Sequence, residues 1–599
     1  MNLPKLAVHR PVTTAMLLVS ILVVGGIAVV RLPQAFLPEV DAPFIGIEVP
    51  YPNSNPTHVE KEIVKPIEEV ISTLPAIKRL HSISNADGAF FELEFDWGQE
   101  IDLVRMAVSE KMEQIEPELP ADVGQVRIFS FSTSDIPVIQ GRLSATGVDL
   151  SESYELIESR IVNRLRRVPG VARVDLGGVA PKEISIDLVL DRVVEHGVDV
   201  GRLIERLRGA TATLVLGEVR EGGLRYTARG LGAFDSVEAL AALPIDERGL
   251  RLGDVAEITY EEPPIAYGRR LDGDFAVALE IFKESTANTV EVVRAATAVI
   301  ENDIGNDPLL QGVRLFVWED QAEAITNGIN GLTKAGLAGS LLALLCLWFF
   351  LRRLDSTLIV SMSIPFSILA ACGVMYFLGK TLNILSTMGL ILGVGMLVDN
   401  AVVVLESIDR KHRTVADPKK AALLGAREVA VAVSASTLTS LIVFLPLIVG
   451  GKSELTTWLG EVGIAISIAF ACSLLSSLTL IPLASAHLLR EKKTKPSRTV
   501  TWMEARYERL LGWTLRHRAW TAVGLVVALA AGFAPFAAGL VDTAIFSGTV
   551  NERLYVQYDF QDFAYKSKAR EAVLQVEGFL DGKREEYGVE SIYSYWAEN

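Results

Sequence analysis

Long apolar runs alternate with polar stretches along this chain and divide it into parts suited to a membrane and parts suited to water. The first run covers 12–31, a block of further runs lies within 332–487, and the last covers 519–540. Together they predict a bundle of about seven α-helical spans, because each run is long enough to cross roughly 30 Å of hydrocarbon. We interpret 12–31 as a retained helix, and the alternative is a cleavable signal peptide. Within the block we expect spans near 332–351, 357–378, 382–407, 429–450 and 459–487.

The polar region between the first two runs alternates strand-like and helix-like patterns. Residues 32–134 follow the order β-α-β-β-α-β, which is typical of a split βαβ unit. The same order recurs in 135–179 and 263–330, separated by an insertion at 180–262. The chain is therefore predicted to be an α+β membrane protein, with two sheet subdomains and a third inserted between the parts of the second.

The insertion contains a stretch of extended character, 214–230, that glycines interrupt. Gly217, Gly222 and Gly223 lie in it, and the Gly222–Gly223 pair between two extended runs favours a projecting β-hairpin. An ordinary surface loop is the alternative that composition leaves open.

Basic residues predict the orientation of the chain in the membrane. They cluster near Arg353, Arg410 and Arg490, which all lie on one side if the N-terminal segment 1–11 is cytoplasmic. The large polar region is then extracytoplasmic. Two stretches, 410–428 and 488–517, are expected to lie along the inner membrane surface as basic amphipathic or interfacial helices.

An internal repeat follows the interfacial stretch. The sequence from 516 resembles that from 8, with an offset of about 508 residues. At the same offset, an extended run at 553–560 resembles 44–52, and a helix-like stretch at 567–580 resembles 58–71. We expect a second copy that starts near 516, with 541–599 as the beginning of a third sheet subdomain, so that the chain represents an incomplete transporter.

Composition excludes several classes of function. The net charge of −16 disfavours nucleic acid, and the mean hydropathy of +0.33 is that of a membrane protein. The seven histidines have no metal-ligand spacing, and no nucleotide-binding or hydrolytic motif occurs. We expect no metal, no cofactor and no enzymatic activity.

One charged position lies within the apolar run that contains ILGVGMLVDNAVVVLESI. Asp399, beside the neutral Asn400, is placed at mid-membrane, where an acid costs about 2.5–3.5 kcal/mol and is functional by default. Hydrocarbon disfavours its charged form, so this carboxyl is a candidate proton carrier. The alternative is a fixed hydrogen-bond partner between helices. Gly393 and Gly395 precede Asp399 and predict close approach of a neighbouring helix.

Hydroxyl side chains crowd the next span. The set is Ser434, Ser436, Thr437, Thr439 and Ser440. They are candidates for a water path beside Asp399, with Ser436 and Thr437 as possible relay residues. The alternative is hydrogen bonding to the preceding helical turn, which is common in membrane helices.

The segments HRPVTTAMLLVSILVVGGIAVVRLPQAFLPEVDAP, GVGMLVDNAVVVLESIDR and ASTLTSLIVFLPLIVGG resemble resistance-nodulation-division (RND) efflux transporters, in particular the hydrophobe/amphiphile branch. The resemblance covers the chain as about the first 60% of a typical member. It implies ferredoxin-like porter subdomains at 32–134 and 135–179 with 263–330, and a docking subdomain at 180–262. The 214–230 hairpin becomes an arm that enters a neighbouring protomer.

The resemblance also implies function and partners. These are proton-driven export of small amphiphilic molecules and a homotrimer in the bacterial inner membrane, in contact with its lipid. A periplasmic adaptor (membrane fusion) protein and an outer-membrane channel complete the pump. The alternatives are export of a lipid, metabolite or other non-drug substrate, a non-transporting receptor or scaffold, and a protein-translocation accessory, against which the repeat argues.

Three departures from the family pattern bear on this expectation. Asn400 stands where multidrug members usually have a second acid, so Asp399 is the sole carrier in this half. The family's lysine and hydroxyl partners fall beyond Asn599. The drug-trapping phenylalanines are not matched in FSTSDIPVI, where Asp135 and Ile136 stand.

Overall fold

A computed structural model describes the chain from residue 3 to residue 597 with several gaps. The gaps are 53, 146–149, 151–152, 212–213, 222–223, 231, 247, 264, 266, 352, 490–497, 540–553 and 559–565. Two compact units emerge. Unit 1 comprises Met1–Ile136, Asn288–Val290 and Ala322–Asp559, and unit 2 comprises Pro137–Ala287, Glu291–Gln321 and Phe560–Asn599.

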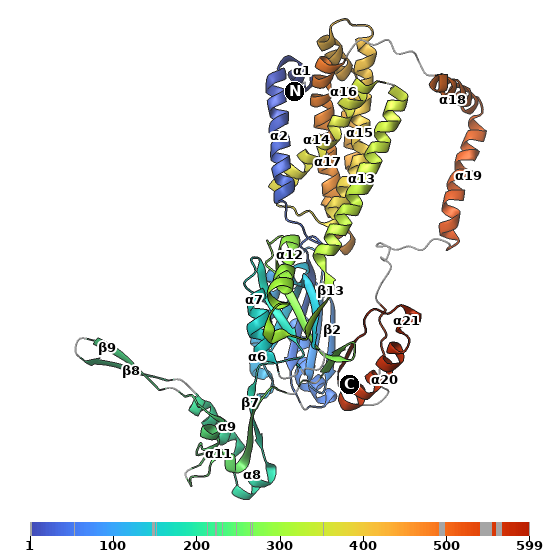
Figure 1. Cartoon of the computed structure of the whole chain (residues 1–599). Coiled ribbons are helices and arrows are strands. Elements are labelled where there is room, and N and C mark those ends of the chain that lie inside the picture. Colours follow the sequence, from blue (N-terminus) through green and yellow to red (C-terminus); the bar gives the residue numbers. More distant parts are fainter. Residues whose placement is uncertain are drawn as a thin grey trace. The chain divides into compact units, whose positions relative to one another are not determined.

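Seven of the described helices are long and apolar enough to cross a membrane (Figure 1). They are α2 (Pro11–Arg31), α13 (Gln321–Leu351), α14 (Leu354–Phe377), α15 (Ile384–His412), α16 (Pro418–Val449), α17 (Glu454–Leu488) and α19 (Arg518–Ala537). Each coincides with one of the predicted apolar runs, although α14, α15, α16 and α19 leave out one to three residues at one end of the run. Several extend past their run, because polar residues at the ends continue the backbone hydrogen bonding of the helix.

A continuous apolar core joins α2, α14, α15, α16 and α17. Glycines allow the closest approaches. A methyl group at Gly389 of α15 would lie 2.7 Å from the Val462 carbonyl oxygen, and one at Gly425 of α16 would lie 2.6 Å from the Ile408 Cα. Such contacts bring helix backbones together, which is how helices associate in lipid.

The stretch 410–428 differs from its expected form. Instead of one helix along the membrane surface, it contains the end of α15 at His412, a short connection, and the start of α16 at Pro418. The side chain of Asp417 accepts a hydrogen bond from the Lys419 amide 3.0 Å away, and this N-cap starts a new helix. The predicted interfacial stretch 488–517 contains helix α18 (Arg498–Arg516).

The first polar stretch contains a four-stranded antiparallel sheet in the order β2-β3-β1-β4. Its strands are β1 (Asp41–Pro50), β2 (Ile77–Asn85), β3 (Gly88–Phe95) and β4 (Arg127–Ser132). The helices α3 (Pro56–Val59), α4 (Lys65–Ile71) and α5 (Ile101–Ile115) supply side chains to the same apolar core. The chain order is the β-α-β-β-α-β order expected from the sequence.

Unit 2 is built on a larger sheet in the order β13-β5-β12-β11-β14, with β6 also paired to β12. The strands are β5 (Ile139–Ala145), β6 (Val171–Gly177), β11 (Tyr267–Leu271), β12 (Asp274–Lys283), β13 (Val313–Asp320) and β14 (Tyr593–Ala597). Its helices are α6 (Tyr154–Ile157), α7 (Asn163–Leu165) and α12 (Thr289–Val299). Leu143, Leu279 and Ile281 of the strands are fully buried.

The insertion folds around its own small core (Figure 1). Strands β7 (Glu183–Leu188) and β10 (Ala256–Glu261) pair antiparallel, beside α8 (Leu190–His196), α9 (Val200–Thr211), α10 (Val237–Ala241) and α11 (Leu252–Val255). The expected hairpin is present as β8 (Leu214–Glu221) and β9 (Leu224–Gly230), in which Gly217 pairs with Ala228. Gly222 and Gly223 lie outside the described residues.

The second copy agrees with its prediction only in part. Helix α20 (Lys566–Asp581) occupies the helix-like stretch expected at 567–580, but the described residues 554–558 of the expected strand form no strand. A strand that the sequence did not predict, β14, pairs with β11 instead. Trp596 of β14 packs with Ala569 and Val573 of α20. The C-terminal segment thus adds β14 to the unit 2 sheet, beside β11.

Two adjacent glycines of α2 provide a test of the helix packing. A methyl group at Gly25 would overlap the backbone carbonyl oxygen of Leu369 in α14, whereas one at Gly26 would meet no described atom within 4 Å. We predict that Gly25→Ala destabilises the bundle by about 1–3 kcal/mol, because one helix must shift. Gly26→Ala should be neutral or slightly stabilising, since alanine is the better helix former. Thermal unfolding of the purified chain in detergent measures both, and equal midpoints would contradict the close crossing.

Candidate functional site

Helix α15 has one packed face and one exposed face, and the candidate carboxyl is on the exposed one. Asp399 belongs to a stripe of exposed residues spaced three or four positions apart, as one face of an α-helix requires. The stripe consists of Leu392, Gly395, Met396, Asp399, Val403 and Glu406. On the opposite face, Leu397 and Ala401 are buried in the core of the bundle.

Asn400 lies at the edge of the packed face and contacts the next helix. Its side-chain Nδ2 donates a hydrogen bond to Thr437 Oγ1 of α16 at 3.0 Å. The Thr437 hydroxyl in turn donates to the Val433 carbonyl at 2.9 Å. The structure therefore brings together two of the residues singled out from the sequence, in a neutral link between α15 and α16.

The remaining candidate residues are distributed over both faces. Gly393 faces α17, where a methyl group would lie 3.2 Å from the Ala469 Cβ, whereas one at Gly395 would meet no described atom within 4 Å. Ser436 is exposed on α16. Within the described part of the chain, Asp399 makes no hydrogen bond or ion pair, so its carboxylate is uncompensated there.

Most of the clustered hydroxyls of α16 bond to their own helix. Besides Thr437, Thr439 donates to the Ala435 carbonyl at 2.9 Å and Ser440 to the Ser436 carbonyl at 3.2 Å. For these three hydroxyls the structure has the back-bonded arrangement that was the alternative to a water path.

Two hydrogen bonds that were not predicted from the sequence join α15 to its neighbours. The Ser473 hydroxyl of α17 donates to the Leu397 carbonyl at 3.0 Å, two residues before Asp399. The Ser407 hydroxyl of α15 donates to the Gly425 carbonyl of α16 at 2.9 Å. Single serines in apolar helices are common, so no sequence pattern distinguishes these two.

A buried arginine ties the end of α15 to the start of α14. Arg353 donates to both carboxylate oxygens of Asp355, at 3.2 and 2.8 Å, and to Asp409 at 2.6 Å. Arg413 completes the cluster at 2.9 Å from Asp409. The hydrogen bonds that Arg353 donates to Asp355 raise the pKa of the guanidinium, so it stays charged. In the sequence, Arg353 served only as a marker of orientation, although the neighbouring acids were a signal of pairing.

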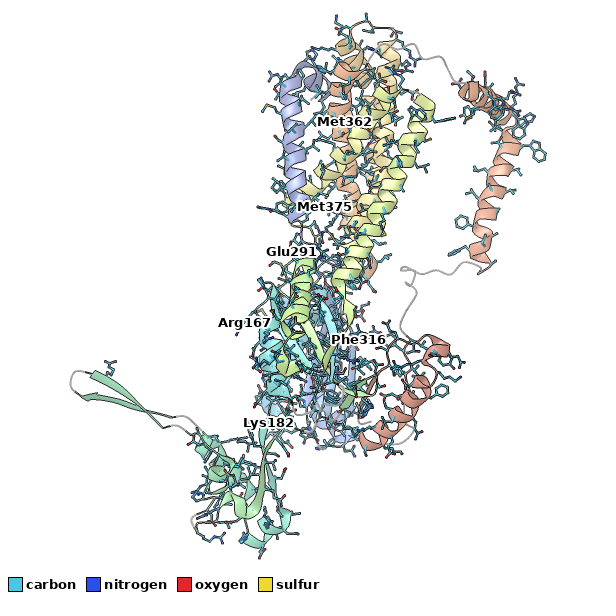
Figure 2. The ribbon with its side chains drawn as sticks, in the orientation of Figure 1. Arg167, Lys182, Glu291, Phe316, Met362 and Met375 are labelled. Carbon is cyan, nitrogen blue, oxygen red and sulfur yellow. The ribbon has the colours of Figure 1, made fainter. Side chains whose placement is uncertain are left out.

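A second polar feature, which was not predicted from the sequence, lies on the sheet of unit 2. Arg142 of β5 pairs in register with Ala278 of β12 and Phe316 of β13, so all three share one face. Phe316 is labelled in Figure 2. The Arg142 guanidinium carbon lies 5.1 Å from the Trp318 ring and 4.6 Å from the Tyr593 ring. Long-range pairing of β5, β13 and β14 assembles this face.

Together these features define a polytopic membrane protein with antiparallel sheet subdomains and an acid in a membrane-length helix. The model of the AcrB/AcrD/AcrF family matches residues 3–588, and the chain belongs to this family of RND transporters. The resemblance seen in the sequence is confirmed. Family membership and the apolar helices make the chain a multi-pass protein of the bacterial inner membrane.

Curated relatives are similar over nearly the whole chain. It is 27% identical to multidrug resistance protein MdtC of Edwardsiella ictaluri, covering 98% of this chain and 59% of that protein. MdtC of Yersinia enterocolitica is 26% identical over 88% of this chain and 52% of the relative. The swarming motility protein SwrC of Bacillus subtilis is 25% identical over 84% and 52%. The chain thus spans between about half and three fifths of the length of these relatives.

The Asn400–Thr437 link generates a prediction with an internal control. Thr437→Val removes the acceptor of the Asn400 amide and should cost about 1 kcal/mol of stability, as expected for a net hydrogen bond. Thr439→Val makes the same chemical change at a hydroxyl that, among the described residues, bonds only to its own helix, and it should have little effect. Thermal unfolding in detergent compares the two. A Thr437→Val midpoint no lower than that of Thr439→Val would show that the link does not stabilise the pair of helices.

Proposed function

We propose that this protein is the inner-membrane component of an RND pump that exports small amphiphilic molecules. The observation that carries this proposal is Asp399, an acid at the middle of the membrane-length helix α15 in a chain of this family. An acid at that depth is costly and is retained where it works. The names of the MdtC relatives, which refer to multidrug resistance, support the same class of substrate.

Protonation of Asp399 is the proposed source of energy. One proton that moves down a gradient of about 200 mV releases roughly 4.6 kcal/mol, at about 2.3 kcal/mol per 100 mV. A two-state element needs about 5.5 kcal/mol to change from 1:99 to 99:1, so one proton biases it strongly. Because the Asn400 amide cannot titrate, Asp399 is the residue of the pair that can take up this proton.

Movement of α15 is the proposed link between protonation and transport. Its ties to Arg353, Ser473 and Gly425 join it to α14, α17 and α16. A shift of α15 on neutralisation of Asp399 is therefore transmitted to the bundle as a rigid-body change rather than absorbed locally.

The sheet subdomains are proposed as the porter and docking parts of the pump. Residues 32–134 and 135–179 with 263–330 form the porter subdomains, and 180–262 forms the docking subdomain. We propose a homotrimer in which the β8–β9 hairpin enters a neighbouring protomer. A periplasmic adaptor and an outer-membrane channel complete the path across a Gram-negative envelope.

A non-drug substrate is the second candidate function. Two observations favour it: SwrC is named for swarming motility rather than drug resistance, and the start of the second porter subdomain has Asp135 and Ile136 in place of the family's phenylalanines. An exporter of a lipid or metabolite would use the same proton carrier.

Replacement of Asp399 by Asn in the chromosome of the native host tests the proposal. We expect cells with Asp399→Asn to accumulate the fluorescent amphiphile N-phenyl-1-naphthylamine as strongly as cells that lack the gene, because Asn cannot carry a proton. Glu406→Gln is the matched control, since Glu406 lies on the same stripe two turns away, and it should retain export. Wild-type export by Asp399→Asn would exclude the carrier role, and normal accumulation in the deletion strain would exclude export of this probe.

A further inference from the structure

We propose that residues 378–383, which connect α14 to α15, form the joint through which movement of α15 reaches the sheet subdomains. Lys380 and Glu461 are the positioning residues that hold this joint in place. The inference rests on the proposed function, in which α15 moves when Asp399 takes up a proton. It adds the place where that movement leaves the membrane helices.

Gly379 determines where α14 ends and the joint begins. Its φ of +66° is a conformation that residues with a Cβ rarely adopt. The Gly379 amide donates to the Tyr376 carbonyl at 3.1 Å, and the Lys380 amide donates to the Met375 carbonyl at 3.0 Å. These two bonds form a Schellman motif, so α14 stops at a defined residue and Lys380 follows in a defined position.

Asn383 starts α15 at the other end of the joint. Its amide donates to Ser386 Oγ at 2.9 Å, and its Oδ1 accepts from the Ser386 amide at 2.8 Å, a reciprocal cap. The Thr381 hydroxyl accepts from Asn383 Nδ2 at 3.0 Å, and the Thr381 carbonyl accepts from Ser386 Oγ at 3.0 Å. Asn383 and Ser386 are fully buried, so the joint and the first turn of α15 form one unit.

Leu382 bonds the joint to the segment that leads from α2 into β1. Its amide donates to the Pro33 carbonyl at 2.9 Å, and its carbonyl accepts from the Ala35 amide at 3.3 Å. The Ile384 amide donates to the Phe36 carbonyl at 3.4 Å. Because the backbone makes these bonds, a displacement of α15 acts directly on the segment that enters the first sheet.

The same segment holds the start of α12. The Thr289 amide donates to the Gln34 carbonyl at 3.1 Å, and Thr289 is fully buried. Thr289 belongs to unit 1, whereas α12 continues from Glu291 in unit 2. Residues 33–36 are thus bonded to the joint and to the first residue of a helix of the second sheet subdomain, and they lead into the first strand of the first.

An ion pair fixes the joint to α17. Lys380 Nζ lies 2.7 Å from Glu461 Oε1, and the two side chains are 32% and 16% exposed. Partly buried pairs are screened by salt less than surface pairs. With the pair in place, α15, the joint and α17 shift together. Without it, the connection flexes between its two helices, and part of the displacement of α15 is lost before it reaches residues 33–36.

Amide hydrogen exchange of the purified full chain in detergent tests the joint without any need for transport. Glu461→Gln should make the Leu382 and Ala35 amides exchange about three- to fivefold faster, the factor expected for losing a partly exposed ion pair. Glu428→Gln is the matched control, because Glu428 pairs with two basic residues at the opposite end of α15. It should leave both amides unchanged. Wild-type exchange in Glu461→Gln, or an equal effect of the control, would overturn the inference.

Export by cells separates a positioning role from a merely structural one. Glu461→Gln should lower export of N-phenyl-1-naphthylamine about threefold or more at wild-type abundance and wild-type thermal midpoint, and Glu428→Gln should not. The double variant Lys380→Glu with Glu461→Lys restores an ion pair of reversed polarity and should recover both export and slow exchange. Faster exchange in Glu461→Gln with wild-type export would show that the pair only stabilises the loop.

These outcomes are distinguishable from failure of the proposed function. Export that depends on Glu461 but persists in Asp399→Asn would support the joint and remove the proposed carrier. Export that is lost in Asp399→Asn, together with wild-type exchange and export in Glu461→Gln, would do the reverse.

Discussion

The packing of α15 against its neighbours is the constraint on which the membrane part of this structure depends. Gly389 and Gly393 let α17 approach, and Gly425 lets α16 approach, so that helix backbones are in direct contact. In lipid there is little hydrophobic gain from joining helices, and close packing with a few hydrogen bonds must supply the stability. These contacts occupy one face of α15. An acid in the same helix can stay outside the packed core only on the other face, where Asp399 lies.

Two ionisable side chains, Asp399 and Arg142, lie in opposite kinds of environment. The acid of α15 is on an exposed stripe beside a neutral amide that is itself hydrogen-bonded, so nothing within the described residues holds it in one state. The guanidinium of Arg142 is buried and held between rings, which orders it without neutralising it. The first environment is consistent with the proton uptake proposed for Asp399, and the second keeps a guanidinium in a fixed position.

Much of the fold could be predicted from the sequence, because its signals are local. Apolar runs locate the membrane-length helices, and extended patterns with turn residues locate the strands of both sheets except β14. The errors arise where the outcome depends on distant partners. The basic stretch 410–428 looks like one amphipathic helix, but an N-cap at Asp417 divides it and Glu428 pairs with Arg410 and Lys411. Arg142 lies in an ordinary strand pattern, and only the register of β13 and the distant β14 surrounds it with rings.

The same limit applies to the candidate carrier. Hydropathy identifies Asp399 as unusual, but the direction in which its side chain faces follows from which side of α15 its glycines and small residues occupy. Asn400 illustrates this point, since one step along the helix moves a side chain from the exposed stripe to a contact with Thr437. Sequence spacing alone does not separate these two environments when neighbouring positions are both polar.

The pairing of β14 with β11 has a consequence for biosynthesis. Leu271 leaves the ribosome well before its partner Tyr593, with roughly 300 residues between them. At about 5–20 residues per second the edge of β11 therefore waits on the order of 15–60 s for its neighbour. An unpaired strand edge invites association with other chains. Arg269 and Arg270 on this strand place positive charge along that edge, which discourages intermolecular pairing while translation continues.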